Sequence, residues 1–151
     1  NDFGNLLSRV TTLIKKNYDG VIPEPGDLGD LDLIIKKKGE ALSKTVHQYV
    51  DNMQLNDAIE EIMQFIRGVN KYMEENAPWK MLKEDKDGAG RILYTAGEAL
   101  RLGAVLLSPI MPNRTKTLLD ALNVKERNFS WGMLQAGTRI KSHEPLFPRI
   151  K

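Results

Sequence analysis

Apolar residues recur at helical spacing in five separate segments of this chain, and no segment sustains the alternation of apolar and polar residues that marks a strand. The clearest stripe contains Ile59, Ile62, Met63, Ile66 and Val69. Spacings of three and four residues place such side chains on one face of a helix. The chain is therefore predicted to be all-α, an antiparallel bundle of about five helices with an extended C-terminal tail.

Proline, glycine and capping signals set the expected ends of these helices. The expected ranges are 2–17, 28–53, a third helix from a cap at Asn56 or Asp57 to residue 76, a fourth from about 87–90 to before Pro109, and 112–122. Residues 19–26 are expected to form a loop, Ser130 to cap a turn at Trp131, and the extended tail to begin at Gly137.

Length and composition limit the class of protein. With 151 residues, the chain is expected to form one domain, 1–151, and its opening without methionine indicates an excised fragment. The 22 basic and 20 acidic residues exclude a polybasic tail, so a nucleic-acid site would have to be local. The absence of cysteine excludes disulfides and fits the cytoplasm, and no apolar run is long enough to predict a membrane span.

The residues that could support catalysis are scattered. His47 and His143 stand alone, and no glycine-rich phosphate loop follows a strand. The acidic pairs 60–61 and 74–75 are adjacent in helices, so their carboxylates point in different directions and are expected to be solvated. We therefore expect no catalytic site and no metal site in this chain.

The first helix carries a polar stripe outside its apolar face. Asn5 and Arg9 are one turn apart, and Thr12 and Lys16 continue the stripe. An amide that donates and accepts, next to a guanidinium with five donors, suits contacts to base edges and phosphates. An ordinary solvated face would give the same pattern.

Trp79 follows Pro78, which is expected to open a short turn after the third helix. A Pro-Trp corner can hold the indole rigidly at the surface, as stacking on an unpaired base requires. A buried, purely structural indole is the alternative. Trp131 has no adjacent polar stripe and is interpreted as a packing residue.

Four segments in this order carry a resemblance: DFGNLLSR at 2–9, YMEENAPW at 72–79, LSPIMP at 107–112 and LFPRI at 146–150. Together they resemble the family of methionyl-tRNA synthetase anticodon-binding domains, from class I aminoacyl-tRNA synthetases, over essentially the whole chain. The resemblance implies a helical bundle that recognises the CAU anticodon of methionine tRNA. It assigns base contacts to Asn5 and Arg9 and base stacking to Trp79. We further expect phosphate contacts from three lysines, Lys16, Lys80 and Lys83.

The family also implies a parent enzyme, an ATP-dependent methionine–tRNA ligase that uses ATP, Mg and methionine. The family's nucleotide signatures and its zinc-binding insertion are missing here, so no aminoacylation and no cofactor are expected in this chain itself. The expected partners are methionine tRNA and the parent's own catalytic domain, with no DNA and no membrane. Two alternatives remain: the anticodon domain of another class I synthetase, and a helical interaction module without RNA binding.

Overall fold

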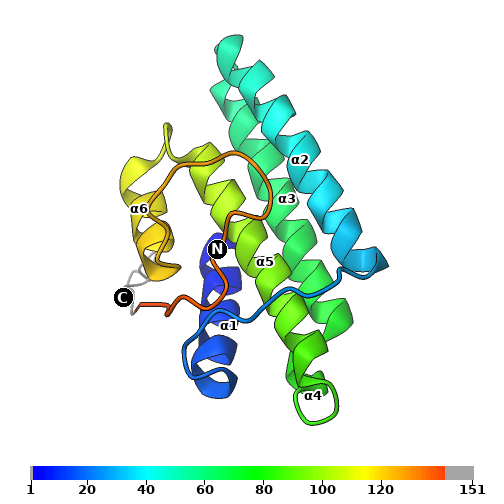
Figure 1. The fold of residues 1–151 in the computed structure, drawn as a ribbon. Helices are drawn as coiled ribbons and strands as arrows, with labels where there is room; N and C mark the ends of the chain where they lie inside the picture. The colour runs from blue at the N-terminus through cyan, green and yellow to red at the C-terminus, as the bar shows by residue number, and fades with distance from the viewer. Residues whose placement is uncertain (1, 142–151) are drawn as a thin grey trace, which may run out of the picture.

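The computed structural model describes residues 2–141, and this range folds as a helical bundle without a strand (Figure 1). Its helices are α1 (Asp2–Asn17), α2 (Asp30–Asp51), α3 (Leu55–Asn76), α4 (Pro78–Met81), α5 (Lys86–Leu107) and α6 (Pro112–Ala121). Five long helices and the single turn of α4 confirm the expected all-α bundle. None of these helices is long and apolar enough to cross a membrane.

Helix α5 is the centre of the bundle and contacts each of the other five helices. Figure 1 shows α2 and α3 as a long antiparallel pair on one side of α5, with α1 and α6 on the other. Almost every residue of α5 is buried, because the other helices pack around it. Gly103 allows close approach, because a Cβ there would lie 3.1 Å from Ile66 and 3.3 Å from Phe3.

The corner after α3 forms where the sequence predicts it. Proline disfavours helical geometry in the residue before it, and Ala77 takes the left-handed conformation with φ 46°. The N–H of Ala77 still donates to the carbonyl of Met73 at 2.9 Å, which closes the last turn of α3. Pro78 then begins α4, so Trp79 lies at a corner, as expected.

The expected cap of α3 at Asn56 or Asp57 is wrong. The helix begins at Leu55 because a tight turn at Met53, with φ 62°, leads directly from α2 into α3. The capping residue is Gln54, whose N–H donates to the carbonyl of Tyr49 at 2.8 Å. Its side chain donates to Asp57 at 3.1 Å, so the carboxylate expected to cap the helix lies inside its first turn.

Helix α5 begins at Lys86, slightly before the expected start. Asp85 is its cap and accepts a hydrogen bond from the N–H of Gly88 at 2.9 Å. The acidic side chain in front of the helix thus satisfies one of its free amides.

The segment after α6 returns to the loop that follows α1. Ile22 and Thr138 are joined by an N–H to carbonyl bond of 2.8 Å, and Ile140 donates to Gly20 at 2.8 Å. Val21 and Arg139 form an isolated antiparallel bridge. The expected extended tail is therefore confirmed as far as residue 141, whereas His143 and the segment 146–150 lie outside the described residues.

Trp131 packs as expected, but its turn is closed differently. Its ring is half-buried against α2, where a Cβ on Gly39 would lie only 3.0 Å away. Ser130 was expected to cap this turn, whereas the structure shows the side chain of Asn128 accepting the N–H of Ser130 at 2.8 Å. The turn is therefore closed by the amide two residues earlier.

Candidate nucleic-acid interface

Helix α1 is amphipathic, and its buried face fixes the direction of its polar stripe. The buried members are Phe3, Leu6, Leu7, Val10, Thr11 and Ile14. Asn5 is exposed and Arg9 is partly exposed. Packing of the apolar face on α3 and α5 therefore turns the stripe toward solvent.

Arg9, Glu74 and Trp79 meet at the surface although they come from α1, α3 and α4. The Arg9 Nη2 lies 2.5 Å from Glu74 Oε1, and the side chains are 40% and 55% exposed. The Arg9 Cζ lies 6.0 Å from the centroid of the Trp79 ring. Trp79 itself is 37% exposed. The structure thus brings together one of the two predicted base-contacting residues and the predicted stacking residue.

A groove of about 550 Å³ runs between these helices. Its lining residues are Ser8, Arg9, Thr12, Leu13, Glu74 and Trp79. It therefore combines an aromatic ring, a cation, a carboxylate, two hydroxyls and one apolar wall. Unpaired bases are held in proteins by stacking on aromatic rings and by hydrogen bonds to their edges, and this groove has groups for both.

Asn5 does not line the groove. It is exposed on α1 one turn before Arg9, on the same side of the helix. Its amide therefore lies beyond the end of the groove and would reach only a ligand that extends along α1.

The three predicted phosphate contacts are exposed lysines around the same end of the bundle. Lys16 is in the last turn of α1, Lys80 follows Trp79 in α4, and Lys83 lies between α4 and α5. Figure 1 shows the end of α1 and α4 at the same end of the molecule. None of the three forms an ion pair within residues 2–141, so their ammonium groups are available to an anion.

Glu74 is the member of this site that sequence reasoning missed. Its pair with Glu75 was interpreted as a solvated face, and the two carboxylates do diverge. Glu75 lies 3.8 Å from Lys71 of its own helix, whereas Glu74 crosses to Arg9 on α1. No spacing rule reports a contact between two helices, so the sequence carried no signal for this one.

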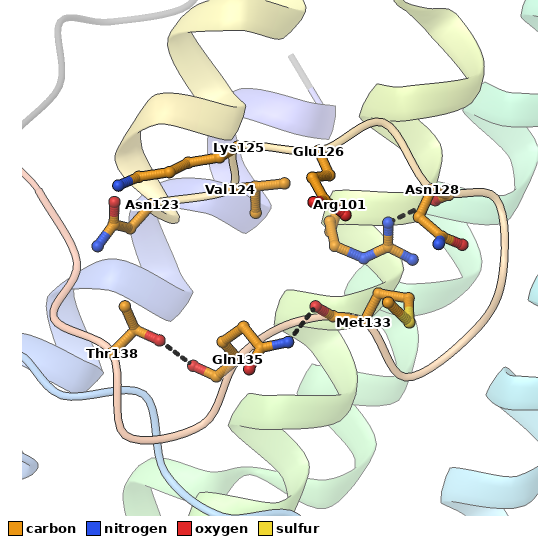
Figure 2. A pocket seen from close by; sticks show the side chains of 9 residues that line it. All are labelled: Arg101, Asn123, Val124, Lys125, Glu126, Asn128, Met133, Gln135 and Thr138. Carbon is orange, nitrogen blue, oxygen red and sulfur yellow. Dashed lines mark hydrogen bonds between the residues drawn. The ribbon is translucent and has the colours of Figure 1, made fainter.

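A second concave surface lies between residues 123–126, which follow α6, and the segment 128–138 (Figure 2). It is a cleft of about 340 Å³, and Arg101 of α5 is one of its lining residues. Arg101 and Glu98 are both fully buried and form an ion pair, with Nε 2.5 Å from Glu98 Oε1. Arg101 also donates to the carbonyls of Asn128 and Ser130, each at 2.6 Å.

Glu98 completes this arrangement from the other side. Its carboxylate accepts the N–H groups of Gly132, Met133 at 3.1 Å and Leu134 at 3.0 Å. Four of the five N–H groups of Arg101 are already donated within the protein. The pair therefore fastens residues 128–134 to α5 and offers little charge to a ligand. No pattern in the sequence indicated this role for either residue.

A buried polar cluster braces the bundle close to the corner. The Tyr72 hydroxyl donates to Asp32, and Arg91 Nε lies 2.7 Å from the other Asp32 oxygen. That oxygen also accepts the N–H of Gly29 at 2.8 Å. Burial, and then the Asp32 carboxylate, raise the pKa of Tyr72 well above its ordinary value, so the phenol stays neutral. The cluster is structural and joins α2, α3 and α5.

The remaining candidates for chemistry show no site. No group of three or more potential metal ligands occurs within residues 2–141. His47 is exposed, with Nδ1 2.6 Å from the Ser43 carbonyl and its ring edge-on to Phe129. The groove between α1, α3 and α4 is therefore the best candidate site.

Comparison with known proteins identifies the family of this chain. A family model described as the anticodon binding domain of methionyl tRNA ligase matches residues 22–151. The methionine–tRNA ligase of Caldanaerobacter subterraneus is 40% identical over 99% of this chain and 25% of that protein. The corresponding ligase of Deinococcus radiodurans is 36% identical over 99% of this chain and 23% of that protein. This chain thus spans about a quarter of these relatives.

Solved structures extend the match to the whole fold. The crystal structure of apo methionyl-tRNA synthetase from Mycobacterium tuberculosis superposes with a TM-score of 0.93 at 30% identity. It covers 100% of this chain and 32% of that one. A structure of the same enzyme bound by methionyl-adenylate gives a TM-score of 0.91 at 29% identity, over 98% of this chain and 31% of that one. The chain therefore belongs to the family of anticodon-binding domains of methionyl-tRNA ligases.

Proposed function

We propose that this chain recognises the CAU anticodon of methionine tRNA as one part of a longer methionine–tRNA ligase. Residues 1–151 form its single anticodon-binding domain, and the catalytic domain lies elsewhere in the longer protein. The parent enzyme is cytoplasmic and uses ATP, Mg and methionine. The length of the relatives supports a longer parent, since this chain covers only about a quarter of them.

One observation carries the proposal: the Arg9 guanidinium lies beside the exposed Trp79 indole in a groove open to solvent. A base unstacked from the anticodon loop lies flat on the indole, a contact worth about 1–3 kcal/mol. Arg9 uses Nη2 toward Glu74 and keeps further N–H donors for a base edge. Asn5, one turn earlier, receives the neighbouring nucleotide.

The exposed lysines act on the backbone rather than on the bases. Lys16, Lys80 and Lys83 contact phosphates around the groove, which adds affinity without base information. Binding is therefore salt-dependent, because each neutralised phosphate releases counterions.

The exposure of Trp79 also supports this function over an interaction module without RNA binding. In that alternative the indole is a packing residue sealed in the interior, whereas here 37% of it is exposed beside a cation. The match to the methionyl family, together with the relatives at 36–40% identity, favours methionine over other class I synthetases.

A binding panel of RNA stem-loops tests the proposal. The loop with CAU is expected to bind best, and each single-base change in the anticodon is expected to weaken binding by about 5- to 150-fold, that is, about 1–3 kcal/mol. Arg9→Ala is expected to weaken binding of the CAU loop and to reduce the difference in affinity between the CAU loop and the loops with other anticodons. Equal affinity for CAU and other anticodons would contradict the proposal. Arg127→Ala, an exposed arginine far along the chain, is the matched control and should change neither value.

A further inference from the structure

The hydroxyl groups on the helices divide into two classes. The helices described here hold eight serine and threonine residues: Ser8, Thr11, Thr12, Ser43, Thr45, Thr95, Thr115 and Thr117. Six of them donate to a backbone carbonyl, five to the carbonyl one turn earlier and Ser43 to that of Phe129. Of these eight helical residues, Ser8 and Thr12 are the two whose hydroxyls form no such bond within residues 2–141.

These two residues are also the ones that line the groove beside Trp79. They are one turn apart on α1, on either side of Arg9 in the sequence, and both are exposed. A helical threonine ordinarily satisfies its hydroxyl by bonding the carbonyl of the preceding turn. Here the hydroxyls keep one donor and two acceptor positions each for a ligand in the groove.

The chemistry around these hydroxyls indicates what they contact. The charged groups of the groove, Arg9 and Glu74, are paired with each other at 2.5 Å. A base stacked on the indole has its face covered by the ring, so its sugar lies at the edge of the stack. The α1 side of the groove is lined by Ser8, Thr12 and Leu13, and a sugar on this side of the indole would meet their side chains. Serine and threonine hydroxyls pair with several bases and distinguish them poorly, whereas a ribose 2′-hydroxyl is both donor and acceptor.

We propose that the Thr12 hydroxyl hydrogen-bonds the ribose 2′-hydroxyl of the nucleotide stacked on Trp79, with Ser8 facing the next sugar. The groove thereby selects RNA over DNA of the same sequence. This proposal rests on the proposed function of the groove. Thr12 is the stronger of the two positions, because the branched side chain of threonine has fewer χ1 rotamers available than that of serine.

The test combines one protein change with one change in the RNA. Thr12→Val removes the hydroxyl, retains the shape, and has nearly the same helix propensity. The ligands are the CAU stem-loop and three versions in which a single anticodon nucleotide lacks its 2′-hydroxyl. One deoxy loop is expected to bind wild-type protein about 3- to 10-fold more weakly, the range of one hydrogen bond. Thr12→Val is expected to bind the all-RNA loop more weakly than wild type by the same factor. With that deoxy loop, Thr12→Val and wild type are expected to have equal affinity.

Thr117→Val is the matched control. Thr117 is on α6 and donates to the Asn113 carbonyl at 3.3 Å, outside the groove. Its substitution is expected to leave every affinity unchanged. Circular dichroism and thermal unfolding of each variant establish that a loss of binding does not arise from a loss of folding.

The other outcomes separate the two proposals. The ribose contact is overturned if Thr12→Val binds the CAU loop as tightly as wild type. It is also overturned if Thr12→Val weakens binding of every deoxy loop by the same factor as binding of the all-RNA loop. If Thr12→Val no longer weakens binding once a base of the loop is changed, rather than a sugar, Thr12 contacts that base. This result overturns the ribose contact as well. Wild-type protein that binds no RNA stem-loop overturns the proposed function, and the ribose contact with it. Preference for CAU in both proteins, together with equal affinity of wild type and Thr12→Val for the all-RNA loop, keeps the proposed function and removes only the ribose contact.

Discussion

Two arginine–glutamate pairs lie next to a tryptophan within residues 2–141, and their surroundings are opposite. Arg101 and Glu98 are fully buried, and they bind the backbone on both sides of Trp131. Arg9 and Glu74 are 40% and 55% exposed beside Trp79. The same residue types thus form a structural clamp at one place and an accessible groove at the other. Burial, rather than residue type, decides which of the two can bind a ligand.

The difference follows from what each pair would lose on rearrangement. A buried charge that loses its partner stays in a low-dielectric environment without compensation, so the clamp holds its geometry. An exposed pair is screened by water and contributes little to stability, so a ligand can replace one partner at small cost. The groove is therefore adaptable, whereas the clamp is fixed.

Replacing the arginine of each pair by methionine is expected to give the largest difference between the two sites. Arg101→Met is expected to destabilise the fold by about 3–5 kcal/mol, because it leaves Glu98 buried and unpaired and two carbonyls without a donor. Arg9→Met is expected to change the free energy of unfolding by less than about 1 kcal/mol. Urea denaturation measures both, and similar losses in the two variants would show that the environments do not differ as described.

The two tryptophans give the next largest contrast, and they separate stability from binding. Trp79→Ala is expected to weaken binding of the CAU stem-loop by about 5- to 150-fold, with a small change in stability. Trp131→Ala leaves a gap against Gly39 and is expected to cost about 1–3 kcal/mol of stability without changing RNA affinity in the folded protein. Fluorescence titration measures the RNA affinity of both variants, and thermal unfolding measures their stability. A loss of stability in Trp79→Ala and a loss of RNA affinity in Trp131→Ala would contradict these assignments.

The smallest expected effect concerns the acidic member of the groove. Glu74→Gln removes a negative charge that opposes phosphates and frees Arg9, so affinity for any RNA loop is expected to rise by about 2- to 5-fold, less than about 1 kcal/mol. The gain should shrink at high salt. Glu75→Gln is the matched control, since that carboxylate faces Lys71. An unchanged affinity in Glu74→Gln would show that the carboxylate does not oppose the ligand.

Most of the fold could be predicted from local signals. The apolar stripes, Pro78 and Pro112 gave the helices and the corner at Trp79, because periodicity and proline geometry act over a few residues. The start of α3 was wrong because the turn at Met53 brings the helix start forward to Leu55, which no capping pattern reports. The site was predicted only in part, for a related reason.

The contacts that the sequence could not show all join distant parts of the chain. Arg9 meets Glu74 sixty-five positions later, and Glu98 meets the backbone of residues 132–134. A stripe on one helix reveals which side chains face outward, but the partner on another helix depends on how the helices pack. Resemblance to the family supplied Asn5, Arg9 and Trp79 as site residues, whereas the hydroxyls of Ser8 and Thr12 emerged from the hydrogen-bond pattern.

The return of residues 137–140 to the loop after α1 has a consequence for how the molecule assembles. Helix α1 is synthesised before the other helices described here, so its partners α3 and α5, and the residues that fasten its end, follow later. Short isolated helices are marginal in water, so α1 has little structure of its own until those partners arrive. The surface that would meet an RNA is thus among the last parts to fold. A nascent chain that ends before residue 137 would lack residues 137–140, which hold the loop after α1 in place.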